Sequence, residues 1–454
     1  GFCDWWLQWY WGFTSPRNPE GENKMKLGEF LCEKKDCTGC GACIQRCPHR
    51  SIEMRADEEG FAYPAVQESC VHCGICGSVC PALNPAPAEG QRYPVGYALK
   101  NTDDVQIRIS ASGAAFPAFA DYVLNQGGVV YGTIWDHQLR AVIARAEKRE
   151  EMAGMYGSKY VQSDTGDMYA IAERDLKEGR FVLFSGVGCQ IAGLRSFLRK
   201  EYPNLVTLQI ICHGAGSPGV FQDYLRNIQR RFGSRPVWLC QTDWKNRKWN
   251  ELIQRYVRFC FEDGREEQWD SSEDGYLSLF LNNVLYREAC YHCRYACLPQ
   301  VGDLTLGDYG GFALARHCAF DKTGGVSQVL VNTARGRELF EACQKEKRFV
   351  CEERPLKECL VFNHNLWKPS ERPAARDAYF AAYQKFPYSQ VEEKFLSQNR
   401  KKQAEKLLRR GIKKILGPKW SCGLLYLTFC KNRVPQKVDQ VISELEEKRE
   451  EIGI

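Results

Sequence analysis

Two cysteine runs near the start of the chain restrict its fold more than any other feature of the sequence. The first run consists of Cys37, Cys40, Cys43 and Cys47, and the second of Cys70, Cys73, Cys76 and Cys80. Each run ends in a proline, so both read Cys-x-x-Cys-x-x-Cys-x-x-x-Cys-Pro. Gaps of two residues let the thiolates of one tight loop turn toward a common centre, and thiolates are soft ligands that suit iron in a tetrahedral sulfur field. Repetition of the whole pattern makes a chance match negligible.

The spacing is the one with which bacterial ferredoxins hold two 4Fe–4S clusters, where the fourth cysteine of each run ligates the other cluster. We therefore predict two ligand sets: cluster I with Cys37, Cys40, Cys43 and Cys80, and cluster II with Cys70, Cys73, Cys76 and Cys47. Zinc is the alternative, because paired Cys-x-x-Cys motifs also bind zinc. A run of three cysteines with a distant Cys-Pro, present twice, fits zinc poorly.

Composition argues against several other classes of protein. The 62 basic and 56 acidic residues give a formal charge of +6, an excess too small to indicate nucleic-acid binding. No apolar run is long enough to predict a transmembrane helix, and no signal peptide of the usual form is present. The 23 cysteines could indicate a secreted disulfide protein, but the length of the chain and the ferredoxin spacing argue against it. We expect free thiols and clusters in a reducing, cytoplasmic setting, in an anaerobe.

The chain divides into five predicted segments. Residues 1–24, rich in tryptophan, are expected to be a non-native or disordered leader, with an aromatic membrane-surface anchor as the alternative. A two-cluster ferredoxin domain is expected over 25–86, followed by a proline-rich linker over 87–94. Residues 95–385 are expected to form one large domain, and 386–454 a basic, helical C-terminal extension.

The large domain is predicted to be mixed α/β. Apolar strands, such as those beginning at Phe181 and Val206, alternate with helical segments, which favours a largely parallel sheet. Loops at the carboxyl ends of such strands build ligand sites, and Cys189 and Cys212 both fall in these loops. Together with Cys290 and Cys293 of a further Cys-x-x-Cys motif, they could hold a third cluster, cluster III. The alternative is that Cys189 and Cys212 are simply small buried residues.

Several segments of the large domain resemble the beta-subunit family of the coenzyme F420 (deazaflavin) hydrogenases and dehydrogenases. These segments, in order, are SASGAAF (110–116), GGVVYG (127–132), GSKYVQSD (157–164), LFSGVGCQIAGLRSFL (183–198), ICHGAGSP (211–218), REACYHC (287–293) and GDLTLGDYGG (302–311). The match runs from about residue 95 to 385, and a ferredoxin module in front of it is an arrangement that the family also contains.

The resemblance implies a flavoprotein in which FAD lies beside a 4Fe–4S cluster and exchanges electrons with it. Carried over, the FAD-site candidates are Ser112, Gly113, Lys159, Tyr160, Gln162 and Asp308. Small residues after Ser112 would let backbone N–H groups approach a pyrophosphate, and Lys159 could neutralise phosphate, although a plain surface lysine is the alternative. The resemblance also favours Cys189, Cys212, Cys290 and Cys293 as the ligands of cluster III.

The sequence departs from the family pattern at three places. The usual Gly-Thr-Pro-Cys reads Gly186-Val187-Gly188-Cys189, the usual Ser-Gly-Gly ends in Ala114, and the usual Asp-Phe-Trp-Gly reads Asp308-Tyr309-Gly310-Gly311. These changes weaken the expectation of deazaflavin binding in particular and leave the cluster ligands intact.

The leading functional hypothesis is an iron–sulfur flavoenzyme that passes electrons between ferredoxin-type clusters and FAD, and then to a small organic substrate or a deazaflavin, in either direction. Its partner would be a ferredoxin or another redox protein. His213 is a candidate proton donor because its ordinary pKa suits that task, with a structural histidine as an equal alternative. Two other hypotheses stay open: a non-catalytic electron-transfer subunit of a larger redox complex, and a chain that kept its clusters and lost the flavin.

Overall fold

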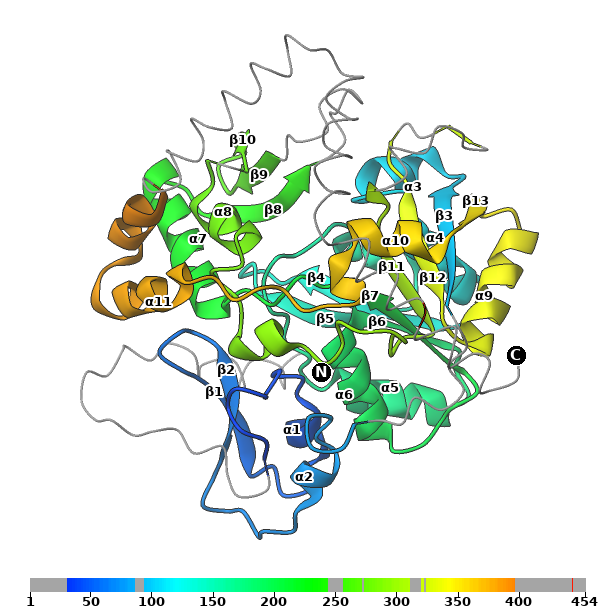
Figure 1. Cartoon of the computed structure of the whole chain (residues 1–454), viewed down its shortest axis with the longest axis horizontal. Coiled ribbons are helices and arrows are strands. Elements are labelled where there is room, and N and C mark those ends of the chain that lie inside the picture. The colour runs from blue at the N-terminus through cyan, green and yellow to red at the C-terminus, as the bar shows by residue number, and fades with distance from the viewer. Residues whose placement is uncertain are drawn as a thin grey trace, which may run out of the picture.

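The computed structural model describes residues 31–85, 94–243, 256–271, 273–310, 320–321 and 324–396, and residue 443 (Figure 1). The expected leader, almost all of the linker and, apart from residue 443, the extension beyond residue 396 lie outside these ranges. Within the described ranges, none of the helices combines the length and the apolar character needed to cross a membrane.

A large mixed sheet forms the centre of the molecule, and in the described part of the chain it has eight strands in the order β13-β3-β12-β11-β7-β6-β4-β5. Its strands are β3 (Val95–Asn101), β4 (Val129–Trp135), β5 (Ala141–Ala146), β6 (Val182–Val187), β7 (Leu205–Ile210), β11 (Leu304–Asp308), β12 (Ser327–Val331) and β13 (Phe349–Arg354). The middle strands β4, β6, β7 and β11 are parallel, and the remaining pairs are antiparallel. The predicted mixed α/β architecture is confirmed, but the sheet is not largely parallel as expected, because three of its strand pairs are parallel and four are antiparallel.

Helices cover both faces of this sheet, because its middle strands are apolar on both sides. Val129 and Tyr131 of β4 pack with α5 and α6 on one face, whereas Val130 packs with α4 on the other. The helices of these layers are α3 (Asp104–Ile109), α4 (Ala115–Asn125), α5 (Met168–Lys177), α6 (Gly188–Leu198), α9 (Ala334–Lys345) and α10 (Leu356–Phe362). Short 3-10 helices add η1 (Arg149–Met155), η2 (Glu288–His292) and η4 (His364–Leu366).

A second, aromatic-rich core lies beside the large sheet. It includes the antiparallel strands β8 (Pro236–Asp243), β9 (Tyr256–Phe261) and β10 (Glu266–Asp270) and the helices α7 (Pro218–Phe232), α8 (Gly275–Leu281) and α11 (Ala375–Lys385). Tyr224 and Tyr276 stack at its centre with ring centroids 5.5 Å apart. Phe61 of the N-terminal module packs into the same core, which therefore joins the two parts of the chain.

The N-terminal module is ferredoxin-like: α1 (Ala42–Arg46), the hairpin β1 (Ile52–Ala56) and β2 (Ala62–Val66), and α2 (Ile75–Ser78). Each helix follows a glycine in the left-handed region, Gly41 at φ 80° and Gly74 at φ 73°, which turns the cysteine loop sharply inward. Figure 1 shows the module, in blue, against α6 and the aromatic core. At the hairpin turn, the Gly219 N–H donates to the Gly60 carbonyl at 3.0 Å.

Candidate iron–sulfur centres and the adjoining cavity

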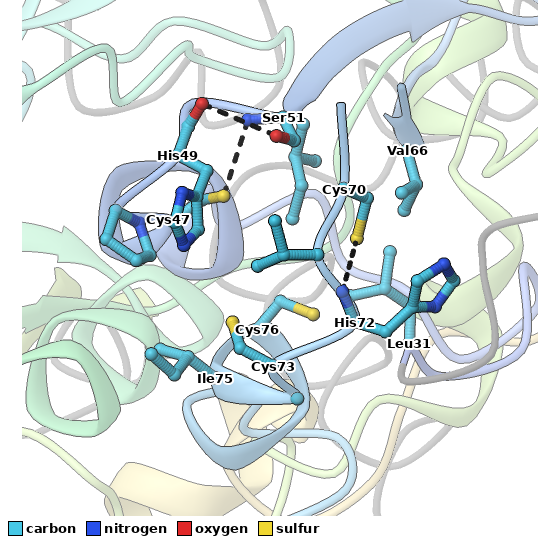
Figure 2. A pocket seen from close by; sticks show the side chains of 14 residues that line it. Leu31, Cys47, His49, Ser51, Val66, Cys70, His72, Cys73, Ile75 and Cys76 are labelled. Carbon is cyan, nitrogen blue, oxygen red and sulfur yellow. Dashed lines mark hydrogen bonds between the residues drawn. The ribbon is translucent and has the colours of Figure 1, made fainter. Parts of the chain in front are cut away.

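The ligands predicted for cluster II surround one small cavity of about 80 Å³. Cys47, from the first cysteine run, lines it together with Cys70, Cys73 and Cys76 of the second run (Figure 2). The rest of the lining is largely apolar, including Leu31, Ile52, Val66 and Ile75. The backbone N–H of Ser51 donates to Cys47 Sγ, and that of His72 donates to Cys70 Sγ, both at 3.4 Å. Such bonds to cluster sulfurs help set a reduction potential.

This donor set fits a cluster. Nowhere in the described residues is a group of three or more His, Cys, Asp or Glu side chains arranged to hold a metal ion. The four thiols instead line a cavity. This arrangement suits a 4Fe–4S cube, because a cube is wider than one metal ion and holds its ligands further apart. Cys73 is exposed, so this cavity lies at the protein surface.

The ligands predicted for cluster I are more deeply enclosed. Cys37 and Cys80 are 7% and 9% exposed. Burial raises the pKa of Cys43, and the thiols of Cys40, Cys37 and Cys80 raise it further. The four predicted ligands of cluster I therefore lie close enough together to interact electrostatically. Cys76 of the second set also contributes to the raised pKa of Cys43, so the two cluster sites adjoin.

One thiol beside cluster I was missed as a functional residue. Cys32 is buried and its side chain hydrogen-bonds to both Cys37 and Cys80, which raises the pKa of Cys32. The same hydrogen bond lowers the pKa of Cys37 to about 6 and that of Cys80 to about 6. Cys32 has no ligand spacing, so sequence reasoning treats it as a structural thiol, and only its position next to the cluster ligands distinguishes it.

The four residues predicted for cluster III come together from three loops. Cys189 begins α6 after β6, Cys212 follows β7, and Cys290 and Cys293 lie in and after η2. Burial, reinforced by the thiols of Cys212, Cys293 and Cys290, raises the pKa of Cys189, and burial raises the pKa of Cys290 to about 11. The Ala215 N–H donates to Cys290 Sγ at 3.3 Å. Cys297, the extra thiol of this segment, is exposed.

Cluster sites I and III are joined by the contact between α6 and the first cysteine loop. Gly193 of α6 faces Cys40 so closely that a Cβ on Gly193 would lie 3.0 Å from Cys40 Cβ and 3.1 Å from its Sγ. Tyr295 also lies in this contact, because a Cβ on Gly188 would be 2.7 Å from Tyr295 Cβ. Burial and the thiols of Cys189 and Cys40 raise the pKa of Tyr295.

A larger cavity of about 330 Å³ opens beside cluster site III. It is lined by the carboxyl ends of β4, β6, β7 and β11, the position at which parallel sheets bind ligands. Most of the predicted flavin and proton-transfer candidates line it, together with two cluster III cysteines: Ser112, Lys159, Tyr160, Gln162, Asp308, His213, Cys189 and Cys212. Thr38 and Gly39 of the first cysteine loop also reach the cavity wall.

Gly113 is the one predicted cofactor residue that does not line the cavity. A Cβ there would meet the Leu99 carbonyl oxygen at 2.5 Å and the Ser327 nitrogen at 2.6 Å. The glycine therefore lets the loop after α3 pass close to β3 and β12, which explains a small residue here by packing. Ser112 is likewise used by the fold, because its hydroxyl donates to the Val326 carbonyl at 2.6 Å.

Lys159 is the cationic group of the cavity wall. Its Nζ donates to the Tyr156 and Gly157 carbonyl oxygens at 3.3 and 3.2 Å. Lys159 is half-buried, and desolvation lowers its pKa to about 7. On the wall near the end of β7, His213 is exposed toward solvent and stands edge-on to His364, with ring centroids 5.9 Å apart.

Comparisons with known proteins agree with both parts of the chain. The family model for the C terminus of the beta subunit of coenzyme F420 hydrogenase/dehydrogenase matches residues 179–357, and that of a 4Fe-4S dicluster domain matches residues 36–84. An uncharacterised ferredoxin of Methanocaldococcus jannaschii is 34% identical over 53 residues, 12% of this chain and 69% of that protein. The VorC subunit of ketoisovalerate oxidoreductase from Methanothermobacter marburgensis is 29% identical over 75 residues, 16% of this chain and 95% of that protein.

Among solved structures, a chain of the F420-reducing [NiFe] hydrogenase complex from Methanosarcina barkeri is 16% identical, with a TM-score of 0.38. The match covers 68% of this chain and 94% of that one.

Proposed function

We propose that this chain, which belongs to the coenzyme F420 hydrogenase/dehydrogenase beta-subunit family and carries a two-cluster 4Fe-4S ferredoxin domain, is an oxidoreductase that joins one-electron to two-electron chemistry. Clusters I and II would exchange single electrons with a ferredoxin or another redox protein. Cluster III would connect them to FAD in the large cavity, where a small organic substrate or a deazaflavin is oxidised or reduced.

The observation that carries this proposal is the unbroken sequence of sites. Cluster site II adjoins site I, because α1 and α2, which carry Cys43 and Cys76, pack against each other. Site I touches α6 through Cys40 and Gly193, and α6 carries Cys189 of site III in its first turn. Cys189 in turn lines the large cavity. Cluster site II lies at the surface, where Val71 of its lining is 56% exposed, and we assign the docking of the redox partner to this face.

The proposed ligands follow the predicted sets, cluster I with Cys37, Cys40, Cys43 and Cys80, cluster II with Cys47, Cys70, Cys73 and Cys76, and cluster III with Cys189, Cys212, Cys290 and Cys293. Each set is made of sulfur donors only, which suits iron–sulfur clusters. FAD, when bound, accepts or donates electrons singly or in pairs. Lys159 would neutralise a phosphate and Asp308 would bond the cofactor from the cavity wall, whereas the Gln162 amide already bonds Arg287 and the Thr38 carbonyl oxygen.

The protein also has a group that can deliver a proton. His213 stands on the cavity wall at the end of β7, and its carbonyl is fixed by a hydrogen bond from Ser370 Oγ. This bond holds the backbone of the loop that carries the exposed imidazole ring at the cavity wall. We assign His213 the exchange of a proton with a substrate in the cavity, because imidazole gains and loses a proton near neutral pH.

Anaerobic purification, with iron and flavin measured on the same sample, tests the proposal. We expect about twelve irons per chain, which corresponds to three 4Fe–4S clusters. Cys290→Ala should lower the count to about eight, while the matched control Cys297→Ala, which removes the exposed thiol of the same segment, should leave it at about twelve. An unchanged count in Cys290→Ala would remove cluster III from the proposal.

Turnover distinguishes an enzyme from an electron-transfer subunit. The isolated chain, reduced with dithionite, should transfer electron pairs to a deazaflavin or another two-electron acceptor. A sample that has a flavin band near 450 nm but exchanges electrons only with viologen dyes is a subunit of a larger complex. A sample that has its irons and lacks that band has no flavin chemistry, and the FAD assignment then fails.

A further inference from the structure

We propose that the buried guanidinium group of Arg287 is the counter-charge of cluster I, supplied by the large domain across the interface with the ferredoxin module. By this inference, Arg287 raises the reduction potential of cluster I and ties that potential to the docking of the two parts. The inference rests on the proposed ligation of cluster I by Cys37.

Arg287 reaches across the interface to the first cysteine loop. It precedes Cys290 in the chain and is 0% exposed. Its Nε donates to the Cys37 carbonyl oxygen at 2.6 Å, and its Nη2 lies 3.7 Å from Cys37 Sγ. Both Nη atoms donate to the Ala62 carbonyl oxygen at 3.1 Å. One side chain thus binds the cluster loop and the β2 strand of the ferredoxin module together.

The remaining contacts fix the plane of the guanidinium group. Nη1 donates to Gln162 Oε1 at 3.0 Å, and Gln162 Nε2 donates to the Thr38 carbonyl oxygen at 3.2 Å. The Tyr63 ring lies under the group, with its centroid 3.8 Å from Arg287 Cζ. A side chain held on one face and along its edges has little freedom to turn away from Cys37.

Arg287 has no carboxylate partner in the described part of the structure. Its hydrogen-bond partners are carbonyl and amide oxygens and one thiol sulfur. Arg376, buried in the same interface at 2% exposure, shows the usual solution: it pairs with Glu59 through two bonds, at 3.0 and 2.5 Å. An isolated buried cation is costly, so a negative group is expected beside Arg287.

Cluster I supplies that negative charge. A 4Fe–4S cube with four thiolate ligands carries net negative charge, which grows by one unit when it takes one electron from a donor, with no bond broken and no proton moved. A fixed positive charge next to one ligand therefore stabilises the reduced cube more than the oxidised cube. Net charge and hydrogen bonds to the sulfurs are the terms through which proteins set cluster potentials.

The position of Arg287 also explains why the counter-charge depends on docking. Cys37 and Ala62 belong to the ferredoxin module, whereas Arg287 and Gln162 belong to the large domain. A module that separates from the large domain loses the cation, and the potential of cluster I falls. No lysine or arginine lines the cavity of cluster II in the described structure; His49 and His72 are the basic residues on its wall, and backbone N–H groups donate to two of its sulfurs.

A redox titration of the full-length, iron-loaded protein, followed by EPR, tests the inference. Arg287→Gln should move one cluster step to a more negative potential by about 59 mV or more, a tenfold change in the equilibrium constant of a one-electron reduction. Arg287→Lys, which keeps the charge without the fork of donors, should move it less. The matched control is Arg294→Gln, because exposed Arg294 also bonds the ferredoxin module, at the Ala82 carbonyl, and should shift nothing.

A second variant covers the case in which Arg287→Gln fails to fold or to bind iron. Gln162→Glu leaves Arg287 in place and sets a carboxylate against its Nη1, so the step should again move to a more negative potential. The inference is overturned if the iron-loaded Arg287→Gln and Gln162→Glu variants show the same cluster reduction potentials as Arg294→Gln.

The underlying ligand assignment has its own readout. Cys37→Ala should lose about four irons per chain. A full iron count in that variant contradicts the ligation of cluster I and therefore the proposed function. Loss of iron in Cys37→Ala together with unmoved potentials in Arg287→Gln contradicts only the role of Arg287.

Discussion

The low pKa of Lys159 gives a direct test of whether the large cavity takes a phosphate-bearing cofactor. Burial lowers the pKa of Lys159 to about 7, so half of the molecules lack the charge at neutral pH. A bound diphosphate would hold the ammonium group charged and raise its pKa. Binding must then take up a proton whenever Lys159 starts out neutral. Affinity for the phosphate ligand should therefore fall as the pH rises above 7.

The size of this effect follows from the pKa of the free protein. With one linked proton and a pKa of about 7, the dissociation constant is multiplied by about 2 at pH 7, about 11 at pH 8 and about 100 at pH 9, relative to its value at low pH. The fall should be nearly tenfold per pH unit above pH 8. Below pH 6 the affinity should be flat, because Lys159 is then already charged.

The assay is titration of flavin-free protein with FAD, followed by quenching of flavin fluorescence between pH 6 and pH 9. Lys159→Arg should abolish the fall, because a guanidinium group stays charged over this whole range. Lys177→Gln, at a lysine 57% exposed on α5, is the matched control and should behave as wild type. Riboflavin, which has no phosphate, should bind with a flat profile.

Two results would refute the reasoning about Lys159. An equal fall in Lys159→Arg and in wild type would mean that another group on the cavity wall titrates, with His213 as the nearest alternative. An equal fall for riboflavin and FAD would mean that the titrating group does not contact the phosphates.

Three further substitutions test the contacts around cluster I. Gly193→Val should press on Cys40 and slow the reduction of cluster III in stopped-flow spectra, because even a Cβ would lie 3.0 Å from Cys40 Cβ; an unchanged rate would place the electron path elsewhere. Gly219→Ala should loosen the hairpin turn by about 1–3 kcal/mol, since its Cβ would lie 2.6 Å from Gly60 Cα. Faster limited proteolysis of the ferredoxin module should report this, and wild-type protection would count against that contact. Cys32→Ala should keep the full iron count but shift a cluster potential, because the Cys32 thiol lies within hydrogen-bonding reach of Cys37 and Cys80; loss of iron would make it a ligand itself.

Sequence reasoning reaches as far as local geometry allows. The spacing of each cysteine run fixes a tight loop, and the structure brings Cys47 to the cavity of the other run, as that spacing predicts. The apolar strands and the loops at Cys189 and Cys212 are predictable in the same way, because alternation of strands and helices determines where strand ends meet. The Cys-x-x-Cys motif makes Cys290 only a candidate ligand of cluster III, because its loop is far from Cys189 and Cys212 in sequence. The family resemblance is what favours it.

Contacts between the two parts of the chain could not be predicted in this way. Arg287 stands out in the sequence only as the first letter of a matching segment, because nothing in its neighbours indicates that it reaches Cys37. Gly193 resembles any small helical residue until α6 is docked on Cys40. Gly113 shows the opposite error: a glycine near a cofactor loop suggests close approach to a phosphate, whereas it approaches the backbone of β3 and β12.

The environments of the two runs give their identical cysteine spacings different chemistry. Cluster site II is shallow, with an exposed ligand in Cys73 and backbone N–H groups as its donors to sulfur. Cluster site I is enclosed, next to the Cys32 thiol and the Arg287 cation. Because a nearby positive charge favours the reduced state, the proposed role of Arg287 places cluster I at a higher potential than cluster II. An electron would then lose free energy on moving from cluster II to cluster I, and the direction of net transfer is set by the potentials of the redox partner and of the cavity's occupant.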